Sequence, residues 1–201
     1  MLFVITGPSG CGKTTLIKKL LKRMRDVQFS VSHTTRKKRH SEREGRDYYF
    51  ISKPEFEQIT KSDKLVEWTE IHGNYYGTSK REIEKKSVKG DLILDVDVHG
   101  AKNIKSKLKK AFFIFVLPPS FHELRRRLEA RGEESRDMIK KRLELARKEI
   151  RAYSLFDYII LNDKLNCAVD ELEAIILSSR CGLNCRKKEI VPILRSFSEE
   201  E

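Results

Sequence analysis

A run of small residues near the N-terminus has the composition and spacing of a phosphate-binding loop. It reads Gly7-Pro8-Ser9-Gly10-Cys11-Gly12-Lys13-Thr14 and lies between an apolar stretch at 2–5 and a predicted helix over 14–25. Glycines let backbone N–H groups surround an anion at a helix N-terminus, where the helix dipole favours negative charge. The lysine can reach the β- and γ-phosphates, and the threonine hydroxyl can bind Mg²⁺. Because strand, loop and helix follow in this order, the run predicts a triphosphate site and not a chance turn.

Two aspartates at the end of a predicted strand over 91–97 could complete a magnesium site. Asp95 and Asp97 share one face of an extended chain, because side chains alternate along a strand. Ligands of open α/β sheets bind at the carboxyl ends of the strands, and a carboxylate there commonly serves the Mg²⁺ of a phosphate-loop enzyme. We therefore expect Thr14 and Asp95 as metal ligands. The alternative is that both aspartates only cap the strand in solvent.

Apolar runs and helical stretches alternate along the chain and must position these groups. Strands are predicted at 2–5, 28–33, 48–51, 65–71, 91–97, 111–117 and 158–161. Helices are predicted at 14–25, 52–60, from 79 onward, 100–108, 120–131, 137–152 and 166–179, several of them behind capping-box residues. This alternation predicts a three-layer α/β fold around a parallel central sheet.

Two segments do not follow the alternation. Residues 34–80 are expected to form a small lobe of short strands and helices inserted into the larger scaffold, with a turn at Gly73-Asn74 and a helix cap at Ser79. The tail 186–201 lacks clear periodicity, so we expect either a docked extension or a frayed end.

Composition limits the classes of function. The 201 residues include 39% hydrophobic and 36% charged residues, with a formal net charge of +12. No apolar run approaches the roughly 20 residues of a membrane span, and the first residues do not form a secretory signal, so a cytoplasmic location is expected. A basic surface attracts polyanions of every kind. Because no nucleic-acid-binding module is visible, nucleotide phosphates explain the charge more economically than nucleic acid does.

Four cysteines do not make a disulfide framework. Cys11 lies in the phosphate loop, whereas Cys181 and Cys185 stand four residues apart. That pair could be half of a metal site, but no second pair of cysteines or histidines accompanies it. Reduced thiols in a cytosolic protein are the favoured interpretation.

Beyond the phosphate loop, an ordered set of short motifs runs along the chain. They are Val31-Ser-His-Thr-Thr-Arg36-x-x-Arg39, Glu42-x-x-Gly45-x-Asp-Tyr48-x-Phe50, Glu67-Trp68, Gly73-Asn-Tyr-Tyr-Gly-Thr78, Leu94-Asp-Val-Asp97, Pro118-Pro-Ser120, Arg127-Leu-x-x-Arg131-Gly132 and Asn162-Asp163. Together with the loop, this set closely resembles the guanylate kinase family, which transfers a phosphoryl group from ATP to GMP. The likeness covers about residues 2–180.

The resemblance implies a nucleoside monophosphate kinase fold divided into four parts. The core would comprise 1–33, 81–124 and 150–180, the GMP-binding lobe 34–80, the lid region 125–149 and a C-terminal extension 181–201. It also implies ATP, GMP and Mg²⁺ as ligands, with dGMP as a second acceptor. No specific nucleic acid or membrane partner is expected, and the chain is expected to be a monomer or a homodimer.

For the acceptor, the resemblance implies that Arg36, Arg39, Tyr48 and Tyr76 bind the GMP phosphate. Guanidinium groups suit a phosphate dianion, and phenol hydroxyls add neutral donors. Glu42 and Asp97 are also assigned to the acceptor site. Ser32, Glu67 and Thr78 would surround the guanine. A carboxylate can accept the N1–H and 2-amino hydrogens of guanine, and adenine offers neither, so Glu67 is expected to determine base specificity.

For the donor, the resemblance implies that Arg127 and Asn162 join the loop residues 7–14 in binding ATP. Lys13, Arg39, Arg131 and Arg142 would be catalytic, because phosphoryl transfer requires in-line positioning and cations around the transferred group. Lys38 replaces the proline that is usual between the two acceptor arginines, which changes no ligand.

Three other functions remain to be weighed. A kinase for another phosphorylated acceptor, such as ribose 1,5-bisphosphate, should lack the guanine-binding set. A guanylate-kinase-like scaffold module should have lost the phosphate loop and the lid arginines. A basic NTPase that binds nucleic acid should show a groove-reading element. The sequence favours the GMP kinase over each of them.

Overall fold

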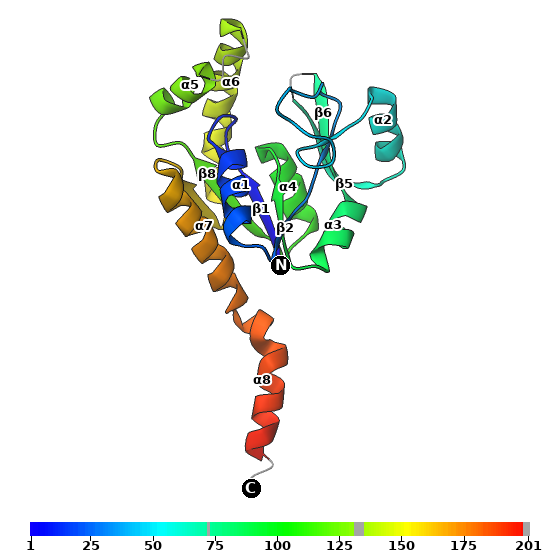
Figure 1. Cartoon of the computed structure of the whole chain (residues 1–201), viewed down its shortest axis with the longest axis vertical. Coiled ribbons are helices and arrows are strands. Elements are labelled where there is room, and N and C mark those ends of the chain that lie inside the picture. Colours follow the sequence, from blue (N-terminus) through cyan, green and yellow to red (C-terminus); the bar gives the residue numbers. More distant parts are fainter. Residues whose placement is uncertain (72, 131–134, 199–201) are drawn as a thin grey trace.

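The computed structural model describes residues 1–71, 73–130 and 135–198, which form two sheets flanked by helices (Figure 1). The central sheet has the order β2-β7-β1-β8-β9, and every neighbouring pair is parallel. Its strands are β1 (Leu2–Thr6), β2 (Val27–Phe29), β7 (Asp91–Asp95), β8 (Phe112–Leu117) and β9 (Tyr158–Leu161). The predicted parallel central sheet is confirmed.

Strand β1 runs through the middle of the core. Phe3 and Ile5 pack with α1 (Lys13–Arg23) and α7 (Leu165–Arg180), whereas Val4 packs on the opposite face with α4 (Val98–Lys107). All three side chains are fully buried. Burial on both faces explains why β1 and its neighbour β8 are nearly continuous apolar runs without alternating polar residues.

A smaller sheet stands beside the central one. It has the order β4-β3-β6-β5, formed by β3 (His33–Thr34), β4 (Tyr49–Phe50), β5 (Leu65–Ile71) and β6 (Asn74–Ser79). Helix α2 (Lys53–Lys61) precedes β5, and α3 (Lys80–Ser87) follows β6 and leads back to the central sheet. Ser52 and Glu55 form the predicted capping box of α2. The boundaries 34–80 of a separate lobe stay a prediction.

Two sequence predictions in these regions are wrong, and one strand was missed. The single strand expected at 28–33 is divided, because β2 ends at Phe29 in the central sheet and β3 begins at His33 in the small one. Strand β6 was not foreseen, since only a turn and a helix cap were expected between 73 and 79. The strand expected at 91–97 ends at Asp95, because Asp97 is the N-cap of α4 and accepts a hydrogen bond from the Gly100 N–H at 2.8 Å.

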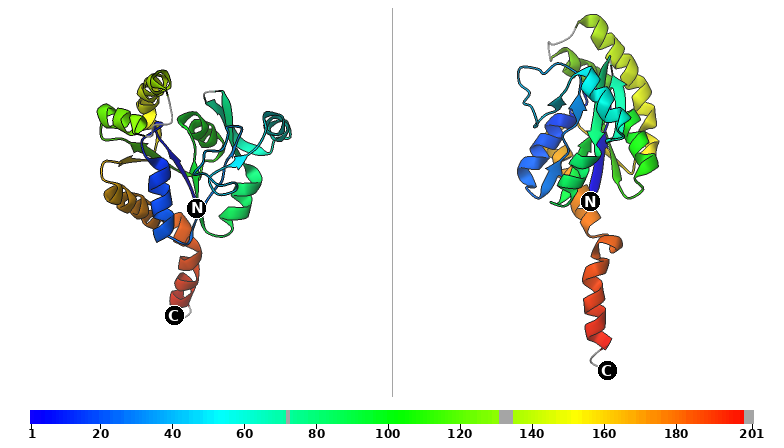
Figure 2. Two further views of the ribbon diagram at one scale, coloured as in Figure 1. Left: turned by 45° about the horizontal axis from the view of Figure 1, so that its top comes forward. Right: turned by 90° about the vertical axis from the view of Figure 1, so that its right-hand side faces the viewer.

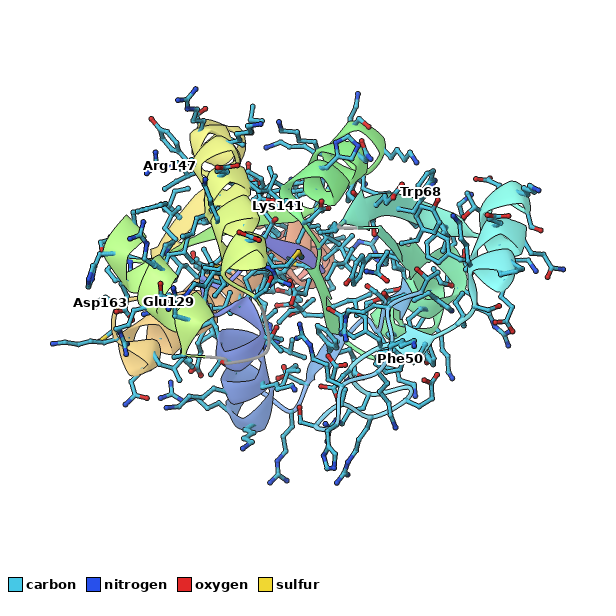
Figure 3. The ribbon with its side chains drawn as sticks, turned by 90° about the horizontal axis from the view of Figure 1, so that it is seen from above. Phe50, Trp68, Glu129, Lys141, Arg147 and Asp163 are labelled. Carbon is cyan, nitrogen blue, oxygen red and sulfur yellow. The ribbon has the colours of Figure 1, made fainter. Side chains whose placement is uncertain are left out.

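Helices α5 (Phe121–Glu129) and α6 (Arg136–Glu149) lie at the top of the molecule in Figure 1, opposite the small sheet. Seen from above in Figure 3, Glu129, Lys141 and Arg147 lie on one side, and Phe50 and Trp68 lie on the other. The helix predicted at 137–152 is α6 followed by a 3₁₀ segment, Ile150–Leu155.

The tail prediction is also wrong, because Leu183–Ser198 form helix α8. None of its residues is buried, and it extends away from the body in Figures 1 and 2. Basic residues around 186–188 and Pro192 inside the helix conceal the pattern in the sequence, since proline removes a helical hydrogen bond. Among the helices in the described part of the chain, none has the length and apolar character of a membrane span.

Candidate active site

The phosphate-binding loop joins β1 to α1 at the carboxyl edge of the central sheet. The Lys13 ammonium donates to the Gly7 carbonyl at 2.8 Å, and the Cys11 N–H donates to Pro8 O at 3.1 Å. Burial alone would lower the pKa of Lys13, but nearby anionic groups, including Asp95 and Glu149, raise it above its ordinary value. The loop therefore presents a permanent positive charge next to its N–H groups.

Side chains from elements far along the chain donate hydrogen bonds to the backbone of the loop. The Asn162 amide and the Arg127 guanidinium both donate to the Cys11 carbonyl, at 2.8 and 3.2 Å. Arg127 also donates to Asn162 O at 2.9 Å and to Glu123 at 2.7 Å. Both residues thus contact the loop, and these hydrogen bonds of Arg127 all go to protein atoms. Direct contact of either one with ATP stays a prediction.

The groups expected to bind Mg²⁺ have suitable chemistry. Asp95 ends β7 beside β1, where it pairs with Ile5, and Thr14 is exposed in the first turn of α1. Burial raises the pKa of Asp95, and the charge of Lys13 opposes that rise. Within the described residues, no three acidic, histidine or cysteine side chains lie close enough to hold a metal alone. Oxygen donors from one or two residues fit Mg²⁺, which takes its other ligands from phosphates and water.

An irregular loop between β3 and β4 carries the basic groups expected to bind the acceptor phosphate. Arg36 donates to Glu42 at 2.7 Å, and its guanidinium lies 5.5 Å from the Tyr48 ring. The Arg39 N–H donates to the same glutamate at 2.9 Å. Tyr48 and Tyr76 contact each other edge to face at 5.9 Å, and burial raises the pKa of Tyr48. The structure therefore brings Arg36, Tyr48 and Tyr76 together, with Glu42 as the partner of the arginine loop.

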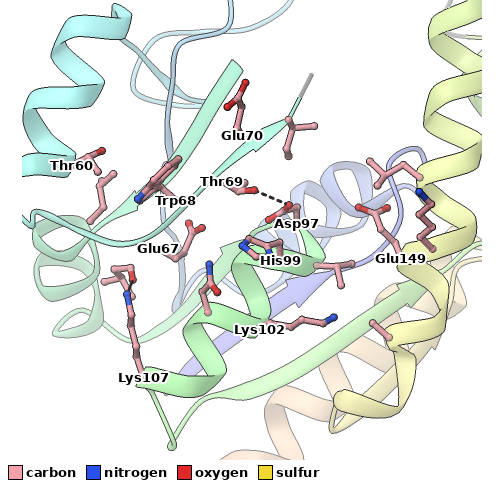
Figure 4. Close-up of a pocket in the computed structure, with 18 of the residues that line it drawn as sticks. Thr60, Glu67, Trp68, Thr69, Glu70, Asp97, His99, Lys102, Lys107 and Glu149 are labelled. Carbon is pink, nitrogen blue, oxygen red and sulfur yellow. Dashed lines mark hydrogen bonds between the residues drawn. The ribbon is translucent and has the colours of Figure 1, made fainter. Parts of the chain in front are cut away.

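The groups expected to bind guanine centre on β5, where Glu67 lies near Asp97 (Figure 4). The Thr78 hydroxyl donates to Glu67 at 2.6 Å inside the protein. Burial raises the pKa of Glu67 to about 7, an increase that the Thr78 bond reduces and the Asp97 charge enlarges. Asp97 accepts from the Thr69 hydroxyl at 3.3 Å. Ser32 is half-buried just before β3, and its carbonyl accepts from the Tyr49 N–H.

A cleft of about 810 Å³ opens beside these carboxylates, and its walls come from β5, α4 and α6. Glu67, Trp68 and Asp97 line one side, and Glu149 lies opposite them on α6 in Figure 4. A space of this size is typical of small-molecule sites. The cleft therefore joins the carboxylates near the phosphate-binding loop to the strand that carries Glu67.

Helix α6 contacts the donor loop directly. Arg142 donates to the Ser9 hydroxyl at 3.1 Å, which places one of the expected catalytic arginines beside the loop. Arg131, the other arginine expected from this region, lies outside the described residues.

Comparisons with known proteins identify the fold and site as those of one family. The guanylate kinase family model matches residues 1–179. This chain belongs to the guanylate kinase family. It is 46% identical to the guanylate kinase of Geobacter metallireducens over 182 residues, 90% of each chain. It is 42% identical to that of Agrobacterium fabrum over 203 residues, 100% of this chain and 92% of the relative.

A solved structure agrees with these sequence matches. The crystal structure of guanylate kinase from Anaplasma phagocytophilum is 31% identical, with a TM-score of 0.76 over 92% of this chain and 88% of that one. Membership of the guanylate kinase family makes this chain an enzyme of the kinase class, with nucleotide and ATP binding as family properties.

Sequence reasoning missed Glu149 in this guanylate kinase family member. It ends α6, one of its carboxylate oxygens is buried with no hydrogen-bond partner, and the Ser9 N–H stabilises its ionised form. Burial raises the pKa of Glu149 to about 7, and the charge of Lys13 limits the rise. Its spacing of seven residues from Arg142 places both on one helix face, which is the signal that could have found it.

We predict that Gly12→Ala disables the donor loop. Gly12 has a φ of 96°, and an added Cβ would lie 2.4 Å from the Asn162 amide nitrogen that holds the Cys11 carbonyl. Strain and clash should weaken MgADP binding about tenfold or more and cost about 1–3 kcal/mol of unfolding free energy. Calorimetric titration and thermal melting measure the two effects.

Gly73→Ala is the matched control for this prediction. Gly73 also has a positive φ, +77°, but no atom lies within 4 Å of a Cβ there. The Gly73→Ala variant should lose about 1 kcal/mol of unfolding free energy from backbone strain and should bind MgADP as the wild type does. Equal MgADP affinity in both variants would contradict the prediction.

Proposed function

We propose that this chain transfers the terminal phosphoryl group of ATP to GMP, giving ADP and GDP, with dGMP as a second acceptor. One observation carries the proposal: a donor loop with Lys13 and an acceptor loop with Arg36 lie in one molecule with a buried glutamate, Glu67, on β5 at the cleft. Family membership supports the same reaction.

Phosphoryl transfer requires the acceptor oxygen to approach the γ-phosphorus in line, with positive charge around the transferred group. In this proposal, the loop N–H groups and Lys13 hold the β- and γ-phosphates. Arg36, Arg39, Tyr48 and Tyr76 orient the GMP phosphate. Arg142 leaves the Ser9 hydroxyl to contact the transferred group, and Arg131 acts beside it.

Mg²⁺ would be held by Thr14 and Asp95, and it would supply charge neutralisation between the β- and γ-phosphates. At the other end of the cleft, Glu67 accepts from guanine N1–H and the 2-amino group, with Thr78 and Ser32 as neighbouring hydroxyls. Closing the lid excludes water, which would otherwise accept the phosphoryl group. We place the reaction in the cytoplasm, which agrees with the four free cysteines, Cys11, Cys167, Cys181 and Cys185.

A coupled assay of ADP release with GMP, AMP, CMP and UMP tests the proposal. GMP should be phosphorylated efficiently, and AMP should be at least about 10⁴-fold poorer in kcat/KM, because it would leave the buried Glu67 unpaired. Strong activity on AMP, or no activity on any of the four nucleotides, would overturn the proposed function. Activity on ribose 1,5-bisphosphate alone would favour the rival kinase.

A further inference from the structure

Asp47 belongs to one of the sequence motifs, yet the reaction described above gives it no task. It lies at the end of the acceptor loop 35–48, which carries Arg36 and Arg39. Its carboxylate is 7% exposed and accepts three hydrogen bonds. The donors are the Arg43 N–H at 3.0 Å, Arg46 Nε at 2.8 Å and Lys18 Nζ at 2.6 Å.

Two of these bonds organise the acceptor loop itself. Burial would raise the pKa of Asp47, but the bonds from Lys18, Arg43 and Arg46 lower it to about 2. The carboxylate is therefore ionised throughout the neutral range. Its oxygens bind a backbone N–H and two cations at once, so Asp47 joins Arg43 and Arg46 of the acceptor loop to Lys18.

The third bond leaves the acceptor loop. Lys18 belongs to α1, the helix that begins at Lys13 in the donor loop. The Lys18–Asp47 pair therefore connects the segment that carries the acceptor-phosphate arginines to the helix that carries the donor-phosphate lysine. Lys18 is 56% exposed, so the pair should contribute less than about 1 kcal/mol to stability.

We propose that Asp47 is a positioning residue that holds the acceptor-phosphate loop in register with the donor helix. The inference rests on the proposed function. In-line transfer requires reacting atoms about 3–3.5 Å apart, and a misplacement of about 1 Å can cost about 10²-fold in rate. A direct bond between the two phosphate-binding segments limits this error without contacting either nucleotide.

Lys18→Met is the sharpest test, because it removes the connection and leaves the bonds within the acceptor loop in place. We expect kcat with GMP to fall about tenfold or more, with less than about threefold change in the GMP dissociation constant. The single tryptophan, Trp68, lines the cleft next to Glu67, so its fluorescence can report GMP binding directly. Asp47→Asn should lower kcat at least as far, because it also weakens the bonds from Arg43 and Arg46, and the double variant should be no worse than Asp47→Asn, because the Lys18–Asp47 ion pair is already lost there.

Lys19→Met is the matched control. Lys19 is the next residue on α1, but it bonds Asn166 on α7 and not the acceptor loop. Its kcat and GMP affinity should equal those of the wild type.

The outcomes separate this inference from the proposed function. If Lys18→Met leaves kcat within about twofold of the wild type, the positioning role is wrong and the kinase assignment stands. If kcat and GMP affinity fall together with the melting temperature, Asp47 acts only on stability and the inference is also overturned. If the wild type itself does not phosphorylate GMP, the proposed function has failed.

Discussion

Lys13→Met is expected to lower kcat by at least about 10²–10³-fold. The ammonium is the fixed cation of the donor loop, and the transition state spreads negative charge over the transferred phosphoryl group. Methionine preserves most of the side-chain length and removes the charge. Single-turnover transfer from ATP to GMP measures the chemical step, and Lys19→Met provides a control on the same helix. A kcat within tenfold of the wild type would contradict the assigned role.

The same substitution should also change the dependence of stability on pH. The raised pKa of Lys13 means that its contribution to the unfolding free energy is complete below about pH 10, the ordinary lysine range, and is lost as the pH rises through the raised value. In Lys13→Met, the carboxylates of Asp95 and Glu149 lose their cation. Their pKa values should rise further, so the variant should be most destabilised above about pH 7. Thermal melts from pH 5 to 9 test this.

Glu67→Gln is expected to have two opposite effects, a loss of GMP use and a gain of stability. The amide would present an N–H where guanine offers N1–H or its 2-amino group, leaving buried donors unpaired. The kcat/KM for GMP should therefore fall by about 10²–10⁴-fold, with little change in MgADP binding. Glu57→Gln, at an exposed position on α2 outside the lining of the cleft, should change neither quantity. Undiminished preference for GMP over AMP in Glu67→Gln would contradict the specificity role.

The stability gain follows from the pKa of Glu67. A carboxyl whose pKa rises from 4.5 to about 7 on folding is more easily ionised in the unfolded chain. The cost therefore develops as the pH rises from about 4.5 to 7 and is complete above that, on the order of 3 kcal/mol. Glutamine removes the titration. Glu67→Gln should thus melt higher than the wild type at pH 8, with the difference shrinking toward pH 4.5.

The same pKa gives a pH dependence for acceptor binding. Guanine requires the ionised carboxylate of Glu67, and below pH 7 a growing share of free enzyme is protonated. The dissociation constant for GMP should therefore rise by up to tenfold for each unit of pH below about 7. Because GMP itself takes up a proton in this range, the comparison is made with Glu67→Gln, which should retain only the ligand's own dependence.

Short sequence patterns predicted the strands and the loop that are specified by residues next to one another in the sequence. Strands β5 and β9 have the predicted bounds, and the donor loop follows from its glycines and Lys13, because each is specified within a few residues. Strand β6 was missed because its residues, Asn-Tyr-Tyr-Gly-Thr-Ser, show no apolar alternation and form a strand by pairing with β5 and β3. Its pairing is a tertiary effect that a short window does not contain.

The site residues also fall into those that a local motif predicts and those that depend on long-range contacts. The acceptor arginines stand in compact motifs, so family resemblance could point to them. Glu149 and the Lys18–Asp47 pair depend on contacts between segments far apart in sequence. Glu149 contacts the Ser9 N–H, and Asp47 binds Lys18, which lies 29 residues earlier on α1. Helix α6 had to be placed over the donor loop before the proximity of Glu149 to Lys13 could be recognised.

Helix α8 is a suitable point for attaching the protein to a solid support. It contributes no buried residue, and it projects from the body away from α5, α6 and the small sheet (Figure 1). A chip or bead that captures the protein through this helix would orient the nucleotide cleft toward the bulk solution. Immobilised enzyme attached there should keep the turnover of the free enzyme, whereas random coupling through surface lysines would block a share of the clefts.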